Sequence, residues 1–135
     1  MRLLDENVDL RTISPLTLAF VGDAVYDLIV REMLVCEANR PVGALNNEKI
    51  QIVRCEAQAK TANRLLPMLN DEELSAFKRG KNAHAQTVPK HADKVDYHTA
   101  TGLEALFGYL YLKGEIDRIR ELFSAGQSHI DISSD

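Results

Sequence analysis

Apolar residues recur at helical spacing along most of this chain. Ser14 and Pro15 are typical of a helix start, and apolar residues then return every three or four positions until about Glu37. The recurring positions are Leu18, Val21, Val25, Ile29 and Met33. Phe20 and Leu28 widen the apolar surface beyond one stripe, so we expect a buried central helix.

The same spacing and the usual end signals predict four further helices. They are expected at about 44–66, from 70 to 77 or 78, at 101–113 and at 115–125. Asn70 followed three positions later by Glu73 matches a capping box at a helix start. Gly80, Gly114 and Gly126 are expected to end the helices that precede them.

The pattern favours a single helical domain. No stretch alternates apolar and polar residues as a β-strand would, so we expect an all-α fold. The domain is expected at 14–125, between an N-terminal arm at 1–13 and a polar C-terminal tail at 126–135. The chain has no apolar run near the ~20 residues of a membrane span and no apolar leader. We therefore expect a cytoplasmic protein without a membrane partner.

Positive charge is concentrated in one segment of an otherwise acidic chain. The net charge is −4, but the stretch from Lys78 to Lys94 holds five positive residues and one acid, which leaves −8 for the remainder. This distribution is typical of an anion-binding face, with a solvated basic loop as the alternative. The surrounding residues, 81–98, are polar and are expected to be irregular or only briefly helical.

Cysteine and histidine residues do not indicate a metal site. Cys36 and Cys55 are 19 positions apart and belong to no CxxC motif, so we expect two reduced thiols in the core. His84, His91 and His98 are spaced by seven positions, which matches no familiar metal site, and we expect them to contact solvent or a ligand.

Asp23 stands where a hydrophobic core is expected. It lies in the middle of the most apolar helix, within LAFVGDAVY at 18–26. A buried carboxylate without a partner is costly, so it usually changes its protonation state or binds a cation. The alternative is an acid hydrogen-bonded to Tyr26 or to a helix N-terminus. Gly22 is unfavourable inside a helix and indicates close approach of another backbone or a ligand.

Glu104 is a second acid in an apolar setting, within TGLEALFG at 101–108. Thr101 and Glu104 also match a capping box, and this purely structural role stays open. If Glu104 and Asp23 face one cleft, they repel by about 4 kcal/mol at ~4 Å and an effective dielectric constant of ~20. A divalent cation relieves this repulsion, and oxygen ligands favour Mg²⁺ or Mn²⁺. Beside a basic segment, such a site suits phosphodiester hydrolysis.

The two acidic segments resemble the ribonuclease III family. LAFVGDAVY at 18–26 resembles the signature of ribonuclease III catalytic domains, whose centre is Gly-Asp. TGLEALFGYLYL at 101–112 resembles the second acidic motif of the same domains. KRGKNA at 78–83, followed by Thr-Val-Pro at 87–89, is similar to the short branch called mini-ribonuclease III. Judged by the order and spacing of these motifs, the resemblance covers residues 14–125.

This resemblance implies a fold and an activity. The fold would be a ribonuclease III-type helical bundle that forms a homodimer. The activity would be a magnesium-dependent endoribonuclease, with Mn²⁺ as a substitute metal, that cuts double-stranded RNA by metal-activated attack of water. The products would carry a 5′-phosphate and a 3′-hydroxyl, and the substrate would be a precursor of large-subunit (23S) ribosomal RNA. The need for a ribosomal protein as a partner stays open.

The resemblance also assigns residues to these roles. Asp23 and Glu104 match the catalytic, metal-binding acids of the family. We expect no separate double-stranded-RNA-binding module after Glu115, so the basic segment would bind the RNA. The residues expected to do so are Arg79, Lys81, Asn82, His84 and Lys90.

The chain departs from the full-length enzymes of the family at two positions. Ala19 stands where those enzymes have a metal-binding Glu, and Thr101 stands where they have an Asp. Two acids instead of four predict one firmly held magnesium ion. The departures also keep an alternative open, a ribonuclease III fold that binds RNA or a ribosome without cutting. A helical interaction scaffold without nucleic acid is a third possibility.

Overall fold

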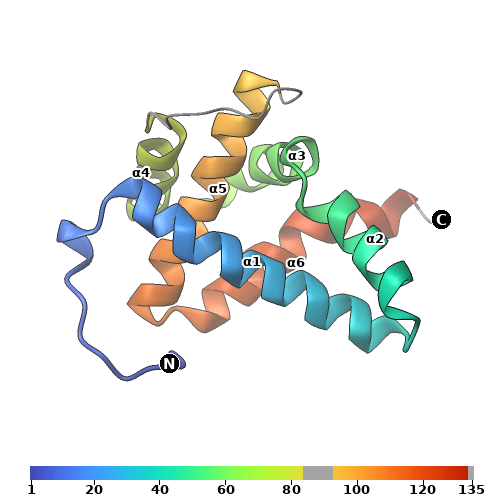
Figure 1. Ribbon diagram of the computed structural model, residues 1–135. Coiled ribbons are helices and arrows are strands. Elements are labelled where there is room, and N and C mark those ends of the chain that lie inside the picture. The colour runs from blue at the N-terminus through green and yellow to red at the C-terminus, as the bar shows by residue number, and fades with distance from the viewer. Residues whose placement is uncertain (84–92, 134–135) are drawn as a thin grey trace.

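The computed structural model describes residues 1–83 and 93–133, with side chains to residue 127 (Figure 1). Every regular element within these ranges is a helix, which confirms the all-α prediction. The elements are the 3₁₀ helices η1 (Leu10–Thr12) and η2 (Leu66–Met68) and the α-helices α1 (Pro15–Glu37), α2 (Val42–Val53), α3 (Cys55–Leu65), α4 (Asp71–Lys81), α5 (Lys94–Lys113) and α6 (Ile116–Ser133). No helix in these ranges is long and apolar enough to cross a membrane.

Helix α5, and not α1, is the central helix of the fold. It packs against α1, α3, α4 and α6 (Figure 1), and nearly every residue from Thr99 to Leu110 is buried. Helix α1 buries one face against α5, while Phe20 is 79% exposed and Leu28 is 58% exposed. The prediction that α1 is buried on most sides is therefore wrong for the isolated chain, because the other helices cover only part of its apolar surface.

Tyr26 connects three helices in the core. Its ring is fully buried and lies edge-to-face against Phe107 of α5, with 5.2 Å between ring centroids. It makes the same type of contact with Phe123 of α6 at 5.5 Å. Aromatic pairs prefer this geometry, because the positive edge of one ring meets the negative face of the other. The contacts fix α1 and α6 against the middle of α5.

Two predicted helix starts, at Ser14 and Asn70, and one predicted end are confirmed. The backbone N–H of Thr17 donates to the Ser14 hydroxyl at 3.2 Å, at the start of α1. Asn70 and Glu73 form the predicted capping box, with distances of 2.9 and 3.0 Å. Gly114 follows α5 with a φ of 85°, a left-handed conformation that favours glycine.

The helix predicted at 44–66 is two helices, α2 and α3. They meet at Arg54, whose backbone is extended with φ −72° and ψ 159°. Neither proline nor glycine occurs at this break, so no local signal in the sequence marks it. The break turns α3 so that Ala59, Ala62 and Leu65 join the buried core.

Two glycines that were expected to end helices lie inside them. Helix α4 continues past Gly80 to Lys81, and a Cβ at Gly80 would lie 2.5 Å from the Ala105 Cβ. Helix α6 continues past Gly126, where a Cβ would lie 2.7 Å from a methyl group of Thr61. Both glycines therefore allow close helix packing. Helix α5 also begins earlier than predicted, at Lys94.

Both cysteines are free thiols, as expected. Cys55 is half-buried at the start of α3, but Cys36 is exposed near the end of α1. The prediction that both lie in the core is therefore wrong for Cys36.

Candidate active site

Two glycines let α1 and α5 cross with their backbones in contact. A Cβ at Gly22 would lie 1.6 Å from the carbonyl oxygen of Glu104, and one at Gly108 would lie 1.9 Å from the carbonyl oxygen of Leu18. These distances are far below a van der Waals contact, so any side chain at either position would force the helices apart. The prediction that Gly22 marks the close approach of another backbone is confirmed.

The crossing brings Asp23 of α1 and Glu104 of α5 together. Their carboxyl groups share a hydrogen bond. Glu104 is half-buried, whereas Asp23 is exposed. The expectation that Asp23 is buried in the core is therefore wrong, because its face of α1 is open to solvent.

Two structural alternatives, a Tyr26 partner for Asp23 and a capping role for Glu104, do not match this geometry. The Tyr26 hydroxyl faces α3 and α6, at Thr61 and Gln127, instead of Asp23. Thr101 does not cap a helix, because it lies in the interior of α5 and its hydroxyl donates to the carbonyl oxygen of Tyr97 at 3.0 Å. Glu104 is therefore free of the capping role that its sequence position also suggested.

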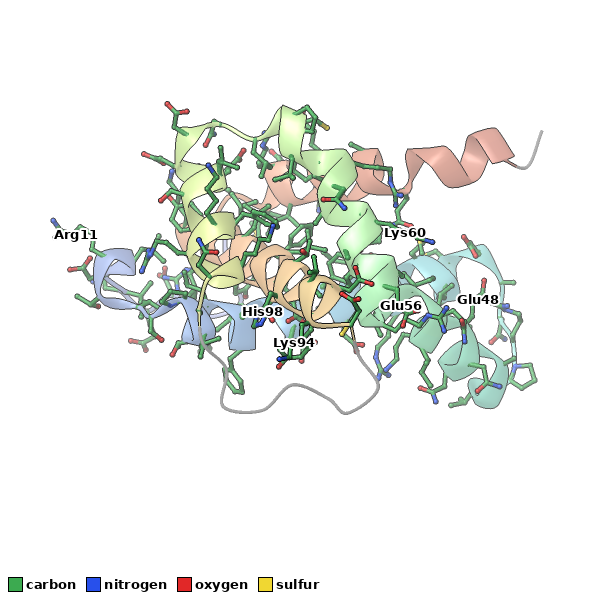
Figure 2. All side chains as sticks on the ribbon, turned by 90° about the horizontal axis from the view of Figure 1, so that it is seen from above. Arg11, Glu48, Glu56, Lys60, Lys94 and His98 are labelled. Atoms are coloured by element: carbon green, nitrogen blue, oxygen red, sulfur yellow. The ribbon has the colours of Figure 1, made fainter. Side chains whose placement is uncertain are left out.

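The two acids share a pocket of about 490 Å³. Helix α1, the junction of α2 with α3, and the first half of α5 form its walls. The lining residues are Asp23, Val53, Arg54, Cys55, Glu56, Gln58, Tyr97, Ala100, Thr101 and Glu104. Figure 2 shows α5 between α4 and the start of α3, where Glu56 is labelled.

The environment of Glu104 disfavours its negative charge. Burial raises the pKa of the Glu104 carboxyl from 4.5 to about 8, and the charge of Asp23 and the hydrogen bond with Asp23 add to this increase. A hydrogen bond with Gln58 acts in the opposite direction. Near neutral pH, and without a cation, the pair therefore holds a proton on Glu104. A divalent cation between the carboxyl groups would replace that proton.

Three lining residues have no motif that marks them in the sequence. Gln58 hydrogen-bonds Glu104, Tyr97 lies one turn before Thr101, and the Arg54 guanidinium lies 3.1 Å from a carboxylate oxygen of Glu56. One signal could have found Gln58, because it falls on the buried stripe of α3 that continues with Thr61 and Leu65. A polar residue on such a stripe needs a hydrogen-bond partner.

The basic residues predicted to bind RNA lie at the end of α4, outside the pocket. Arg79, Lys81 and Asn82 are exposed there. Gly80 packs against Gly102 and Ala105 of α5, which lie two positions before and one position after Glu104. The basic end of α4 therefore lies on α5 at the level of the acidic pair. The other two predicted residues, His84 and Lys90, fall outside the described residues.

The described part of the chain offers two acids as metal donors, and not a larger cluster. No group of three or more His, Cys, Asp or Glu side chains in it could hold a metal ion. Ala19 and Thr101 stand where full-length enzymes of the family are expected to have acidic ligands, and neither side chain carries a carboxylate. Thr101 contributes a hydroxyl to the pocket wall.

Comparison with known proteins identifies the family. The ribonuclease III domain model matches residues 16–115, a range that contains both acids. This chain belongs to the ribonuclease III family. Mini-ribonuclease 3 from Thermoanaerobacter sp. is 42% identical over 123 residues, which cover 87% of each chain. Mini-ribonuclease 3 from Symbiobacterium thermophilum is 40% identical and covers 89% of this chain and 92% of its own length.

A solved structure has a similar fold. The X-ray crystal structure of a Fusobacterium nucleatum protein matches the ribonuclease III fold of this chain with a TM-score of 0.82 and 28% identity. The match covers 91% of this chain and 94% of the other. The family match and the named relatives confirm the resemblance to mini-ribonuclease III, and the family match with the similar structure confirms the ribonuclease III-type bundle.

Membership in the ribonuclease III family makes this chain an endoribonuclease. Members of the family bind double-stranded RNA, act as dimers and generally depend on divalent metal ions.

Proposed function

We propose that the chain cleaves double-stranded RNA in the pocket formed by α1, α3 and α5, with Asp23 and Glu104 as its catalytic acids. The observation that carries this proposal is the backbone contact of Gly22 with Glu104, which places two carboxyl groups from distant segments against each other. When both groups are ionised, such an arrangement destabilises the protein unless a metal cation joins it. The family match over 16–115 lies within a catalytic unit that we place at 14–125.

The donor set fits Mg²⁺, with Mn²⁺ as a substitute. Carboxylate oxygens are the donors that these ions prefer, and Mg²⁺ keeps several water ligands, so two acids are enough to hold it. Asp23 is exposed in the pocket, where solvent can complete the coordination. A bound Mg²⁺ lowers the pKa of water and stabilises negative charge on a phosphate. We propose products with a 5′-phosphate and a 3′-hydroxyl.

The protein side chains supply orientation and charge. Glu104 is fixed by burial and by its hydrogen bonds, and Asp23 is an exposed residue that lines the same pocket. We propose that Arg79 and Lys81 contact phosphates and that Asn82 contacts a 2′-hydroxyl, since A-form RNA is recognised through these groups. His84 and Lys90 would extend this contact along the duplex.

A homodimer would place two such sites on one RNA duplex. An apolar groove of about 1160 Å³ runs along the outer face of α1 and α6. Phe20 and Leu28 lie in it, and Asp23 lines it as well as the acidic pocket. A self-complementary interface on this face would cover the apolar surface that α1 exposes and would bring the two active sites close to the dimer axis.

The proposed substrate is a precursor of large-subunit (23S) ribosomal RNA. This part of the proposal is supported by similarity to proteins named Mini-ribonuclease 3 over most of the chain. A ribosomal protein that presents the RNA would be a compatible partner.

Cleavage of an end-labelled RNA duplex tests the function. The wild-type chain is compared with Asp23→Asn and Glu104→Gln in Mg²⁺ and in Mn²⁺, with folding checked by circular dichroism. We expect cleavage by the wild type and a loss of at least about 100-fold in each variant, because a metal ligand is removed. If the folded wild type binds the duplex in both metals and never cuts it, the non-cleaving binding module is the correct description.

A further inference from the structure

Gln58 is a polar side chain in an almost completely buried position. It is 3% exposed and lies in the first half of α3, where its stripe continues with Thr61 and Leu65. Burying an amide is unfavourable unless its hydrogen bonds are satisfied, and Leu or Met would fill such a position without that cost. The amide therefore needs an explanation other than packing.

The partner of Gln58 is the carboxyl group of Glu104. The Gln58 amide hydrogen-bonds the Glu104 side chain, and both residues line the acidic pocket. A carboxylate is only an acceptor, so the amide N–H of Gln58 donates to a Glu104 oxygen. Gln58 approaches Glu104 from α3, while Asp23 approaches from α1. Glu104 is thus held between two helices.

We propose that Gln58 is a positioning residue that holds the Glu104 carboxylate in its metal-binding orientation, an inference that rests on the function proposed above. The terminal torsion of a glutamate is broad, so a free carboxylate samples many orientations. A hydrogen bond to one oxygen restricts that rotation and leaves the other oxygen directed toward Asp23. Hydrogen-bond partners of metal ligands typically contribute about 10- to 100-fold to metal affinity or activity.

The break between α2 and α3 contributes to this arrangement. Arg54 has an extended backbone, and α3 begins at Cys55, one turn before Gln58. Helix α3 packs against α5, where Glu104 lies. The direction that α3 takes after the break therefore brings the Gln58 amide to the Glu104 carboxyl group.

Binding of Mn²⁺ alone to the metal-free folded chain tests this inference. Electron paramagnetic resonance of free Mn²⁺ gives the dissociation constants of the wild type and of Gln58→Met, which conserves volume and removes the amide. We expect Gln58→Met to bind Mn²⁺ about 10-fold more weakly or worse, with an unchanged melting temperature in EDTA and unchanged duplex RNA binding without metal. Gln51→Met, an exposed glutamine on α2, is the matched control and should bind like the wild type.

The outcomes separate this inference from the proposed function. If Asp23→Asn and Glu104→Gln lose Mn²⁺ binding while Gln58→Met keeps wild-type affinity, Gln58 does not position Glu104 and only this inference fails. If the two acid variants bind Mn²⁺ like the wild type, the metal site is wrong and both proposals fail. If Gln58→Met does not fold, Gln58→Asn replaces it, since its shorter amide is also withdrawn from Glu104. Wild-type affinity in Gln58→Asn overturns the inference in that case.

Discussion

Asp23 and Glu104 occupy different environments although their carboxyl groups meet. Asp23 is exposed, while Glu104 is half-buried and hydrogen-bonded from two sides. The charge of this pair is therefore unfavourable mainly at Glu104, which retains its proton to about pH 8 in the absence of metal. Because of such an acid, the stability of the folded protein depends on pH and on bound cations.

This environment predicts how stability changes with pH in the metal-free protein. The unfolded chain releases the Glu104 proton near pH 4.5, and the folded chain releases it near pH 8, so stability falls as pH rises between these values. The limiting slope from this group is about 1.4 kcal/mol per pH unit. We expect Glu104→Gln, which stays neutral, to gain stability relative to the wild type as pH rises from 5 to 8.

Urea denaturation in EDTA at several pH values measures this effect. The difference in unfolding free energy between Glu104→Gln and the wild type cancels the titration of the remaining groups. A difference that stays constant from pH 5 to 8 would contradict the raised pKa.

The sequence indicated both acids at the residue scale but not their surroundings. Asp23 was expected in the core because its neighbours on α1 are apolar, yet Phe20 and Leu28 are exposed. A sequence pattern cannot distinguish an apolar face that meets the core from one that is open on the single chain. Gln58 was not identified because no spacing links it to Glu104, which lies 46 positions later.

At the scale of helices, the crossing of α1 and α5 determines the site. The starts of α1 and α4 could be predicted because Ser14 and Asn70 cap them through local hydrogen bonds. Helix ends could not be predicted from glycine alone. One glycine, Gly114, ends α5, whereas another, Gly80, lies within α4 and permits close packing. Which role a glycine has depends on tertiary contacts that local pattern does not contain.

The crossing predicts the effect of Gly22→Ala. The new Cβ would lie 1.6 Å from the Glu104 carbonyl oxygen, so α1 and α5 must separate and Asp23 must move from Glu104. Overpacking of this kind costs about 1–3 kcal/mol, and a contact with backbone atoms belongs at the upper end. We expect a less stable protein that also cleaves duplex RNA more slowly.

Gly43→Ala provides the matched control in urea denaturation and duplex cleavage. No heavy atom lies within 4 Å of a Cβ built at Gly43 in α2. Alanine should therefore stabilise the protein there by about 0.5–1 kcal/mol through its higher helix propensity, without a change in cleavage. Equal stability changes in the two variants would show that the backbone contact at Gly22 is not a constraint.

At the scale of the whole molecule, the apolar groove along α1 and α6 is the surface that we expect a second subunit to cover. It combines large exposed apolar side chains with a position next to the acidic pocket. A ribonuclease III dimer with this interface would depend on α1 for both assembly and chemistry, since Phe20 and Asp23 lie within one turn of each other.

This placement predicts that Leu28→Glu prevents dimer formation. In a symmetric dimer the substitution occurs twice, and losing two buried leucines costs about 3 kcal/mol or more, so the dissociation constant should rise at least about 100-fold. Sedimentation velocity over a range of concentrations measures the change. Val42→Glu introduces the same charge at an exposed valine outside the groove and should leave assembly unchanged. Wild-type assembly of Leu28→Glu would exclude this interface.

The contact between Gly22 and Glu104 also has a consequence for synthesis of the chain. Asp23 leaves the ribosome early, but its partner acid is 81 positions later and belongs to a helix that joins the core only when most of the chain has been made. A domain folds as a unit during synthesis, so the proposed site is absent from every shorter nascent chain. The ribosome and its messenger themselves contain RNA, and the nascent chain would therefore acquire its cutting activity only when its synthesis is nearly complete. Fragments that stop before α5 would not cleave the RNA around them.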